Sequence, residues 1–339
     1  MAQMKYYYEL TISSSPHVHA PVTTRTIMRD VIIALLPALA GAVYFFGFRA
    51  LTVTLVSVLA CYVFEKLYCK LMKLDDKTYD LSACVTGMLL AFVCPPTIAY
   101  WQIVMGAAFS ILLVKMLFGG IGRNIVNPAL AGRAFLLSWP VAMSTWVKVG
   151  FENAVSPFAN MDPAKLAADG LTAATPLANM HQGLMPEASL SQMFLGNIGG
   201  CIGETSALLL LIGFAYLLIR KVITPRIPLV YIGTVAVLTF LFPPGKDRLA
   251  WMAAKVFGGG LMLGAIFMAT DYVTSPITRK GQIIYAVGCG LLTVLIRYFG
   301  GYNEGVSYAI LVMNACVVLL DRIGRPTKYG APKKEAAKK

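Results

Sequence analysis

A turn of hydroxyl-bearing and small residues lies in the one long polar loop of an otherwise apolar chain. It reads Asp-Gly-Leu-Thr-Ala-Ala-Thr-Pro-Leu over residues 169–177. Gly170 permits backbone angles that other residues avoid. The two alanines between the threonines leave the approach to Thr175 open, and Pro176 stiffens the exit from the turn. The pattern is suited to presenting a hydroxyl for covalent modification; the alternative is an ordinary surface turn.

Two acidic residues near the ends of apolar runs are the sharpest candidates for function, because ionisable groups inside hydrocarbon are costly and usually functional. Glu204 stands in GETSALLLL and Asp271 in MATDYVTSP, where the hydroxyls of Thr274 and Ser275 follow. We interpret both acids as candidates for an ion pathway; the alternative is that they are helix-end charges satisfied by caps or neighbours. Four other charged residues are near enough to the ends of apolar runs to snorkel to the interface: Lys115, Arg133, Arg297 and Glu304.

The cysteines and histidines argue against a metal cofactor. The seven cysteines are scattered through apolar runs without a Cys-x-x-Cys pair, so no iron–sulfur cluster is coded locally. We expect them to be packing residues, with Cys84 or Cys201 as candidates for a cluster shared with another chain. His17, His19 and His181 lie outside the runs, and the first two are a weak metal site without a third ligand. If electrons pass through this chain, an organic cofactor is the expected carrier.

The composition predicts a membrane protein. Of 339 residues, 58% are hydrophobic and 13% are charged, whereas about a quarter are charged in a soluble domain. Because lipid offers no partners to backbone amides, we predict an all-α polytopic membrane protein with about ten transmembrane helices. The ten apolar runs are 30–48, 51–70, 81–96, 99–118, 124–144, 200–219, 227–243, 249–269, 281–298 and 305–321.

The net charge of +13 is spread over short connections instead of one basic face. Positive-inside sorting explains this distribution better than nucleic-acid binding does. Ten spans place both termini and all basic clusters in the cytoplasm, and the loop 148–196 outside. The clusters are Arg25 and Arg29; Lys66, Lys70, Lys73 and Lys77; Arg220, Lys221 and Arg226; Arg279 and Lys280; and the tail.

The spans and loops predict five regions. A cytoplasmic N-terminal segment covers 1–29 and lacks the residue order of a cleavable signal, so we expect it to be retained. The first transmembrane half covers 30–147, the external loop 148–196, the second transmembrane half 197–321, and a basic cytoplasmic tail 322–339.

An internal repeat underlies the prediction of two related halves. Pro95-Pro96 recurs as Pro243-Pro244, and at the same offset Pro128 matches Pro276. Duplicated halves with interrupted helices are typical of transporters. The order of the spans, however, predicts that the two matched segments have the same orientation across the membrane. Either one span is a re-entrant half-helix, inside 120–144, or the proline match is accidental and the prolines arose independently at the ends of spans.

Six stretches resemble the RnfD and NqrB family of membrane subunits and cover nearly the whole chain in order. The turn at 169–177 is similar to the flavinylation motif of these subunits. The resemblance implies ten membrane helices in two related halves, with a fold like that of small-solute transporters. The stretches are SSSPH (13–17), DLSACVTGMLLAFVCPP (80–96), GGIGRNIVNPALAGRAF (119–135), GNIGGCIGETSALLLLIG (196–213), GGGLMLGAIFMATDYVTSP (258–276) and GGYNEGVSYAILVMN (300–314).

The resemblance also implies the cofactors. Thr175 would be esterified to the phosphate of FMN, with Asp169, Gly170 and Thr172 in the same site. A separate flavin transferase would activate the hydroxyl, which is a poor nucleophile unaided. The family commonly has Gly where this chain has Ala173. Relatives also bind a non-covalent riboflavin, and four polar residues of this chain are candidates to hold it. The alternative is that these residues cap a broken helix. Those candidates are Arg123, Asn124, Asn127 and Arg133.

Within the family the chain looks closer to RnfD than to NqrB, because SSSPH begins at residue 13. We therefore predict an electron-transfer subunit of an ion-translocating ferredoxin:NAD⁺ oxidoreductase in the bacterial cytoplasmic (inner) membrane. It would pass electrons through covalent FMN and contribute to Na⁺ or H⁺ translocation. Its partners would be an external FMN-bearing subunit and iron–sulfur subunits of the complex. The alternatives are a component like the NqrB subunit of a Na⁺-pumping quinone reductase, a small-solute transporter without redox activity, and a structural anchor.

Overall fold

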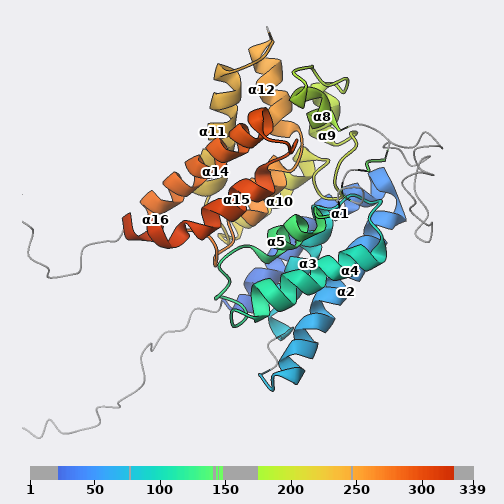
Figure 1. Ribbon diagram of the computed structural model, residues 1–339, viewed down its shortest axis with the longest axis vertical. Helices are drawn as coiled ribbons and strands as arrows, with labels where there is room; N and C mark the ends of the chain where they lie inside the picture. The colour runs from blue at the N-terminus through green and yellow to red at the C-terminus, as the bar shows by residue number, and fades with distance from the viewer. Residues whose placement is uncertain are drawn as a thin grey trace, which may run out of the picture.

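Helices without strands make up the described part of this computed structural model, which covers residues 22–75, 78–139, 143, 145–147, 175–245 and 247–323 (Figure 1). The predicted all-α class is confirmed for these residues. The helices are α1 (Thr24–Phe46), α2 (Phe48–Leu71), α3 (Ser82–Phe92), α4 (Tyr100–Ala108), α5 (Pro128–Leu136), α8 (Pro176–His181), α9 (Leu190–Leu195), α10 (Ala207–Ile219), α11 (Arg226–Leu241), α12 (Arg248–Phe257), α13 (Leu261–Leu263), α14 (Arg279–Phe299), α15 (Val306–Ala315) and α16 (Val317–Ile323). A 3₁₀ turn, η1 (Thr78–Asp80), and two π-helical segments, η2 (Phe109–Met116) and η4 (Gly264–Met268), complete the described elements.

The first two helices form a hairpin whose turn is set by glycine. Thr23 and Thr26 form a capping box at the start of α1, so two orphan backbone donors are satisfied. Gly47 separates α1 from α2 with a φ of 79°, a region that favours glycine. The chain therefore reverses without a loop, and α1 packs against α2.

Only some of the helices are long enough to span a bilayer. Helices α1, α2 and α14 have the length and apolar composition of a membrane span. Two further pairs qualify if each is one bent span: α12 with α13 and η4, bent by 62°, and α15 with α16, bent by 59°. Each of the ten predicted runs contains a described helix. Because α3, α5 and α10 are short, the count of ten crossings stays a prediction.

Two stretches of irregular backbone interrupt the helices, and the second of them enters the interior. Residues 119–127 are not helical and lead into the nine-residue α5, as the re-entrant alternative requires. In the second stretch, residues 196–206, Ile202 N donates to Cys94 O (3.0 Å) and Gly203 N donates to Phe92 O (2.9 Å). These bonds satisfy backbone groups that lipid would leave unpaired. A side chain at Gly203 would overlap the Phe92 ring.

Close packing of glycines places α3 and α5 at the centre. On α5, a Cβ at Gly132 would overlap Ser110 Oγ of η2. On α3, Gly87 lies against the α2 backbone, where its carbonyl accepts a hydrogen bond of 2.7 Å from Ser57 Oγ. The two short helices are thereby enclosed by longer ones, and their ends define the sites described below.

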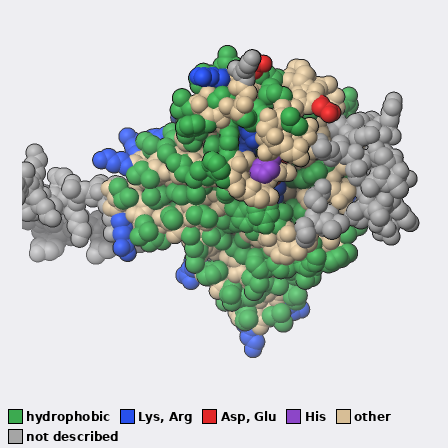
Figure 2. Space-filling view, turned by 45° about the horizontal axis from the view of Figure 1, so that its top comes forward, with side chains coloured by type: hydrophobic (Ala, Val, Ile, Leu, Met, Phe, Trp, Pro, Cys, Tyr) green, Lys and Arg blue, Asp and Glu red, His purple; other side chains and the backbone are tan. Residues whose placement is uncertain are grey.

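Basic residues gather at one end of the molecule. The Arg220 guanidinium at the end of α10 pairs with Asp30 near the start of α1, with Nη2 and Oδ2 3.1 Å apart. At the same end, Asp321 of α16 accepts hydrogen bonds from Ile277 N and Thr278 N, just before α14. In Figure 2 most visible Lys and Arg side chains lie along the left and lower margins. Helices α8 and α9 lie at the opposite, upper end in Figure 1.

The two proline pairs follow helices in different surroundings. Pro95-Pro96 follows α3, whose last residues are buried, whereas Pro243-Pro244 follows α11, which exposes Val237 and Leu241. The matched segments thus share a proline break but not a position in the core. The arrangement in two halves stays a prediction.

Candidate functional site

Thr175 lies immediately before α8, at the end of the predicted modification turn. It occupies the N-cap position with extended backbone angles (φ −74°, ψ 149°), and its side chain makes no capping hydrogen bond. The hydroxyl is therefore not used to stabilise the helix. The predicted neighbours Asp169, Gly170, Thr172 and Ala173 lie outside the described residues.

Buried side chains hold α8 in place. Leu177 and Met180 are 3% and 2% exposed, and Met180 packs in a cluster with Met193 and Trp251. His181 Nδ1 lies 3.1 Å from the Arg297 carbonyl oxygen, which joins the end of α8 to α14. Although the helix is short, these contacts position Thr175 relative to the membrane helices.

A cavity beneath Thr175 is walled by small residues and acids. Gly199, Gly200 and Gly259 line it, together with Cys201, Glu204 and Glu304. Gly259 has a φ of +69°, and a Cβ there would overlap Leu177. The glycine-rich stretches of the sequence thus leave room beside the threonine.

A second and larger cavity adjoins the first. Its volume is about 500 Å³, within the range of roughly 300–1,000 Å³ typical of small-molecule sites. It lies between the end of α5 and the segment 301–308, and it shares Trp146, Asn303 and Glu304 with the cavity beneath Thr175. Tyr302 and Tyr308 line it, with ring centroids 5.0 Å apart.

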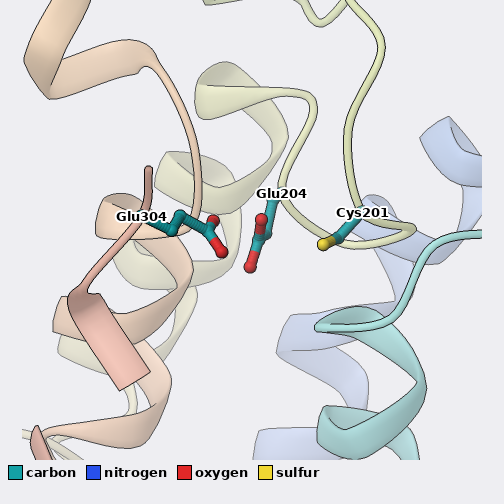
Figure 3. A group of neighbouring side chains, drawn as sticks. All are labelled: Cys201, Glu204 and Glu304. Carbon is teal, nitrogen blue, oxygen red and sulfur yellow. The ribbon is translucent and has the colours of Figure 1, made fainter. Parts of the chain in front are cut away.

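Between the two cavities, Arg133 of α5 binds two carboxylates. Its Nη1 donates to Glu204 Oε1 (3.2 Å) and to Ser307 Oγ (3.0 Å). Its Nη2 donates to Glu304 and lies 3.9 Å from Cys201 Sγ. Figure 3 shows Glu304 and Glu204 pointing toward one another, with the Cys201 thiol beside them. The Arg133 Nε is buried and has no hydrogen-bond partner among the described residues.

The donor set of this cluster is a poor cation site. Ligand atoms of Cys201, Glu204 and Glu304 lie within 4.8 Å of one another. Both carboxylates, however, accept hydrogen bonds from the Arg133 guanidinium, which already supplies the positive charge. A metal ion would have to displace that charge, so these residues fit a polar network better than a metal.

The snorkelling prediction was wrong. Lys115 is 2% exposed, Arg297 1% and Arg133 6%, and each binds protein groups instead of the interface. Lys115 Nζ pairs with Glu65 Oε2 at 2.7 Å, and Arg297 donates to the carbonyls of Lys255 and Gly258. Sequence reasoning overlooked Glu65, although an acid inside the run 51–70 was a visible signal. Burial inside the helix bundle, not distance to the membrane surface, decides where these charges lie.

A third cavity lies at the opposite end of α5, where three predicted residues meet. Asn124, Asn127 and Asp271 line it together with Lys115 and Thr270. Asn124 Oδ1 is buried without a hydrogen-bond partner among the described residues, whereas Asn127 caps α5 and donates to the Met268 carbonyl. The other two candidates for a second flavin do not belong here. Arg123 is exposed beside Gly119, and Arg133 lies in the cluster described above.

Asp271 is held by the turn that follows it. Its Oδ2 accepts a hydrogen bond of 3.1 Å from Thr274 Oγ1, and its Oδ1 lies 3.4 Å from Val273 N. Ser275 contributes its backbone amide, which donates to the Asp271 carbonyl. The two predicted ion-pathway acids therefore lie at opposite ends of α5, Glu204 near Thr175 and Asp271 near the basic end.

Comparison with known proteins identifies the family. A model of the NQR2, RnfD, RnfE family matches residues 11–330. The chain belongs to this family. It is 46% identical over 328 residues to the D subunit of the Na⁺-translocating ferredoxin:NAD⁺ oxidoreductase complex of Acetobacterium woodii, covering 96% of each chain. It is 42% identical over 337 residues to the D subunit of the proton-translocating ferredoxin:NAD⁺ oxidoreductase complex of Clostridium ljungdahlii, covering 94% of this chain and 96% of the relative.

More distant family members have the same extent. The D subunit of the ion-translocating oxidoreductase complex of Aeromonas salmonicida is 36% identical over 349 residues, which cover 95% of this chain and 99% of the relative. Family membership and the apolar helices together show a multi-pass membrane protein. The resemblance found in the sequence motifs is confirmed.

Proposed function

We propose that this chain is the RnfD-type subunit of an ion-translocating ferredoxin:NAD⁺ oxidoreductase complex and that Thr175 carries FMN through a phosphoester. The observation that carries the proposal is the position of Thr175, whose hydroxyl makes no capping bond and which lines a cavity that shares wall residues with a larger one. The names of relatives that match along nearly the whole chain support the reaction class.

The residues present fit a flavin. The cavity beside Thr175, of about 70 Å³, leaves space for a phosphate, and the adjoining cavity of about 500 Å³ is large enough for an aromatic ring system. Bound FMN would supply reversible electron transfer. The protein's own part is to fix the attachment point through α8, to enclose the ring and to offer polar partners. Electrons would arrive from and leave to other subunits, which we propose include an external FMN-bearing subunit and iron–sulfur subunits.

In-gel fluorescence tests the attachment. The chain is expressed with a flavin transferase, denatured, and examined for a fluorescent band. We expect a band in the wild type and in Ser191→Ala, which removes an exposed hydroxyl of α9 outside the proposed site. We expect none in Thr175→Val, which keeps the side-chain shape but lacks the hydroxyl. Absence of a band from the wild type would contradict the redox function and favour a transporter without redox activity. A band in Thr175→Val would place the flavin on another residue.

We also propose that the cavity at the basic end, whose volume is about 90 Å³, widens to bind a non-covalent riboflavin. The buried Asn124 Oδ1 is an acceptor without a partner among the described residues, and a flavin ring offers an N–H donor to it. Asn124→Leu should lose flavin that is released by acid precipitation, whereas the exposed Arg123→Gln should keep it. Equal amounts of released flavin in the two variants would refute this site.

Asp271 is our proposed cation ligand at the same end. Asp271 lines a cavity that Asn124 and Thr270 also line, and oxygen ligands suit hard cations. Relatives are named for Na⁺ in one case and for protons in another, so the test compares both. In vesicles with the assembled complex, Asp271→Asn should abolish ion uptake while in-gel fluorescence remains. Unchanged uptake would exclude Asp271 from the pathway, and the same experiment applied to Glu204→Gln tests the second acid.

The proposed topology has the basic end in the cytoplasm and α8 outside, with ten crossings in two halves. Glu187 is exposed near α8, and Arg279 is exposed at the basic end. A cysteine in place of Glu187 should react with an impermeant thiol reagent in intact cells, whereas a cysteine in place of Arg279 should react only after lysis. The reverse pattern would invert the orientation.

A further inference from the structure

We propose that the larger cavity receives the isoalloxazine ring of the FMN on Thr175, and that Arg133 is the residue that orients it. The inference rests on the proposed function, because it assumes the flavin on Thr175. It adds the place of the ring, the residues that flank it and the atom that fixes its polar edge.

The hydrogen bonds of Arg133 point to a ligand. A guanidinium has five N–H donors. Four are directed at Glu204, Ser307, Glu304 and Cys201, while the fifth, on Nε, has no partner among the described residues. Arg133 is only 6% exposed and lines the larger cavity. A buried donor of this kind is normally satisfied, so Nε requires an acceptor, which a group bound in the adjoining cavity would supply.

The charges of the cluster restrict the kind of group. Two carboxylates already compensate the guanidinium, so an additional anion would gain little attraction from Arg133. A neutral ring with carbonyl and ring-nitrogen acceptors meets the requirement. The isoalloxazine ring has such acceptors along one edge, whereas the negatively charged phosphate of FMN stays at Thr175.

Aromatic side chains complete the fit. Trp146, Tyr302 and Tyr308 line the cavity, and flat rings pack by stacking or edge-to-face contact. Trp146 also lines the cavity beneath Thr175, so the two spaces adjoin at this residue. Gly305, with a φ of +69°, lets the chain turn from Glu304 into α15 and brings Ser307 and Tyr308 to the same wall. A tether on Thr175 and a ring beside Tyr308 are thus parts of one site.

The test uses the full chain carrying FMN, within the assembled complex, and compares native with denatured samples. Nearby tyrosine and tryptophan quench flavin fluorescence, so the native signal should be low and should rise on denaturation. Tyr308→Leu should raise the native fluorescence several-fold and increase quenching by added iodide. Arg133→Lys keeps the charge but lacks Nε–H, and it should shift the visible flavin absorption band. Tyr44→Leu is the control, because Tyr44 is 69% exposed on α1.

The outcomes separate this inference from the attachment itself. Loss of the fluorescent band from the denatured wild type would contradict FMN on Thr175. A full band with native fluorescence, iodide quenching and absorption unchanged in Tyr308→Leu and Arg133→Lys would refute the ring site alone. If Arg133→Lys fails to fold, Tyr308→Leu decides, because its side chain lies at the cavity wall outside the charged cluster. Binding of a short-chain quinone that Tyr308→Leu weakens, with flavin signals unchanged, would assign the cavity to a quinone and overturn the proposal.

Discussion

The buried ion pair between Lys115 and Glu65 should be one of the strongest determinants of stability in this protein. Lys115 Nζ lies 2.7 Å from Glu65 Oε2 and 2.6 Å from Ser82 Oγ, and the two charged side chains are 2% and 4% exposed. The lysine belongs to η2, the glutamate to α2 and the serine to α3. One side chain thereby ties three helices together.

Replacing Lys115 with Met removes the ammonium group that lies 2.7 Å from the buried Glu65 carboxylate. Removing one partner of a buried pair costs about 3–5 kcal/mol. At roughly 2–4 °C per kcal/mol, the melting temperature should fall by about 6–20 °C. The double variant Lys115→Met/Glu65→Leu removes both charges, and Ser82 still donates to Asp80 Oδ1. Because replacing both charges with apolar groups is often neutral or stabilising, the double variant should regain the wild-type melting temperature.

A fluorogenic thiol dye measures this melting in detergent, since five of the seven cysteines are buried and react only on unfolding. Lys70→Met is the matched control, because Lys70 is an exposed lysine on the same helix as Glu65. A single Lys115→Met variant that melts with the wild type would show that the pair contributes little. A double variant that melts as low as the single one would show that lost packing, not the loss of the ion pair, lowers the melting temperature.

Two glycine substitutions test the packing of the site. Gly132→Ala should destabilise the protein by about 1–3 kcal/mol in the same melting assay, because its methyl group would overlap Ser110 Oγ; adding Ser110→Ala should recover part of the loss, and no recovery would implicate another neighbour. Gly259→Ala combines a left-handed backbone with overlap of Leu177, at a cost of roughly 2–5 kcal/mol. It should reduce in-gel flavin fluorescence per chain, whereas Gly233→Ala, with open space around it, should not. Equal fluorescence in both would show that α8 does not depend on this contact.

The apolar runs predicted the membrane class and the approximate place of most described helices. Each run partitions into lipid according to its own residues, so a single segment carries the signal without help from the rest of the chain. The same holds for the Thr175 turn and for the family motifs, which are contiguous stretches. The break before α5 could also be predicted from the sequence, because Asn127-Pro128 is a local helix start.

The partners of the buried charges were decided only by tertiary structure. Lys115 and Glu65 are 50 positions apart, and Arg133 and Glu304 are 171 apart. No local pattern relates such residues, and proximity to the end of an apolar run suggested snorkelling instead. Helix packing creates a low-dielectric interior in which an ionised side chain must pair with one of opposite charge. Which residue becomes the partner depends on how the longer helices enclose the short helices α3 and α5. The sequence by itself therefore determined that this is a membrane protein with a candidate attachment threonine, while the fold decided that Arg133, Glu204 and Glu304 meet beside it.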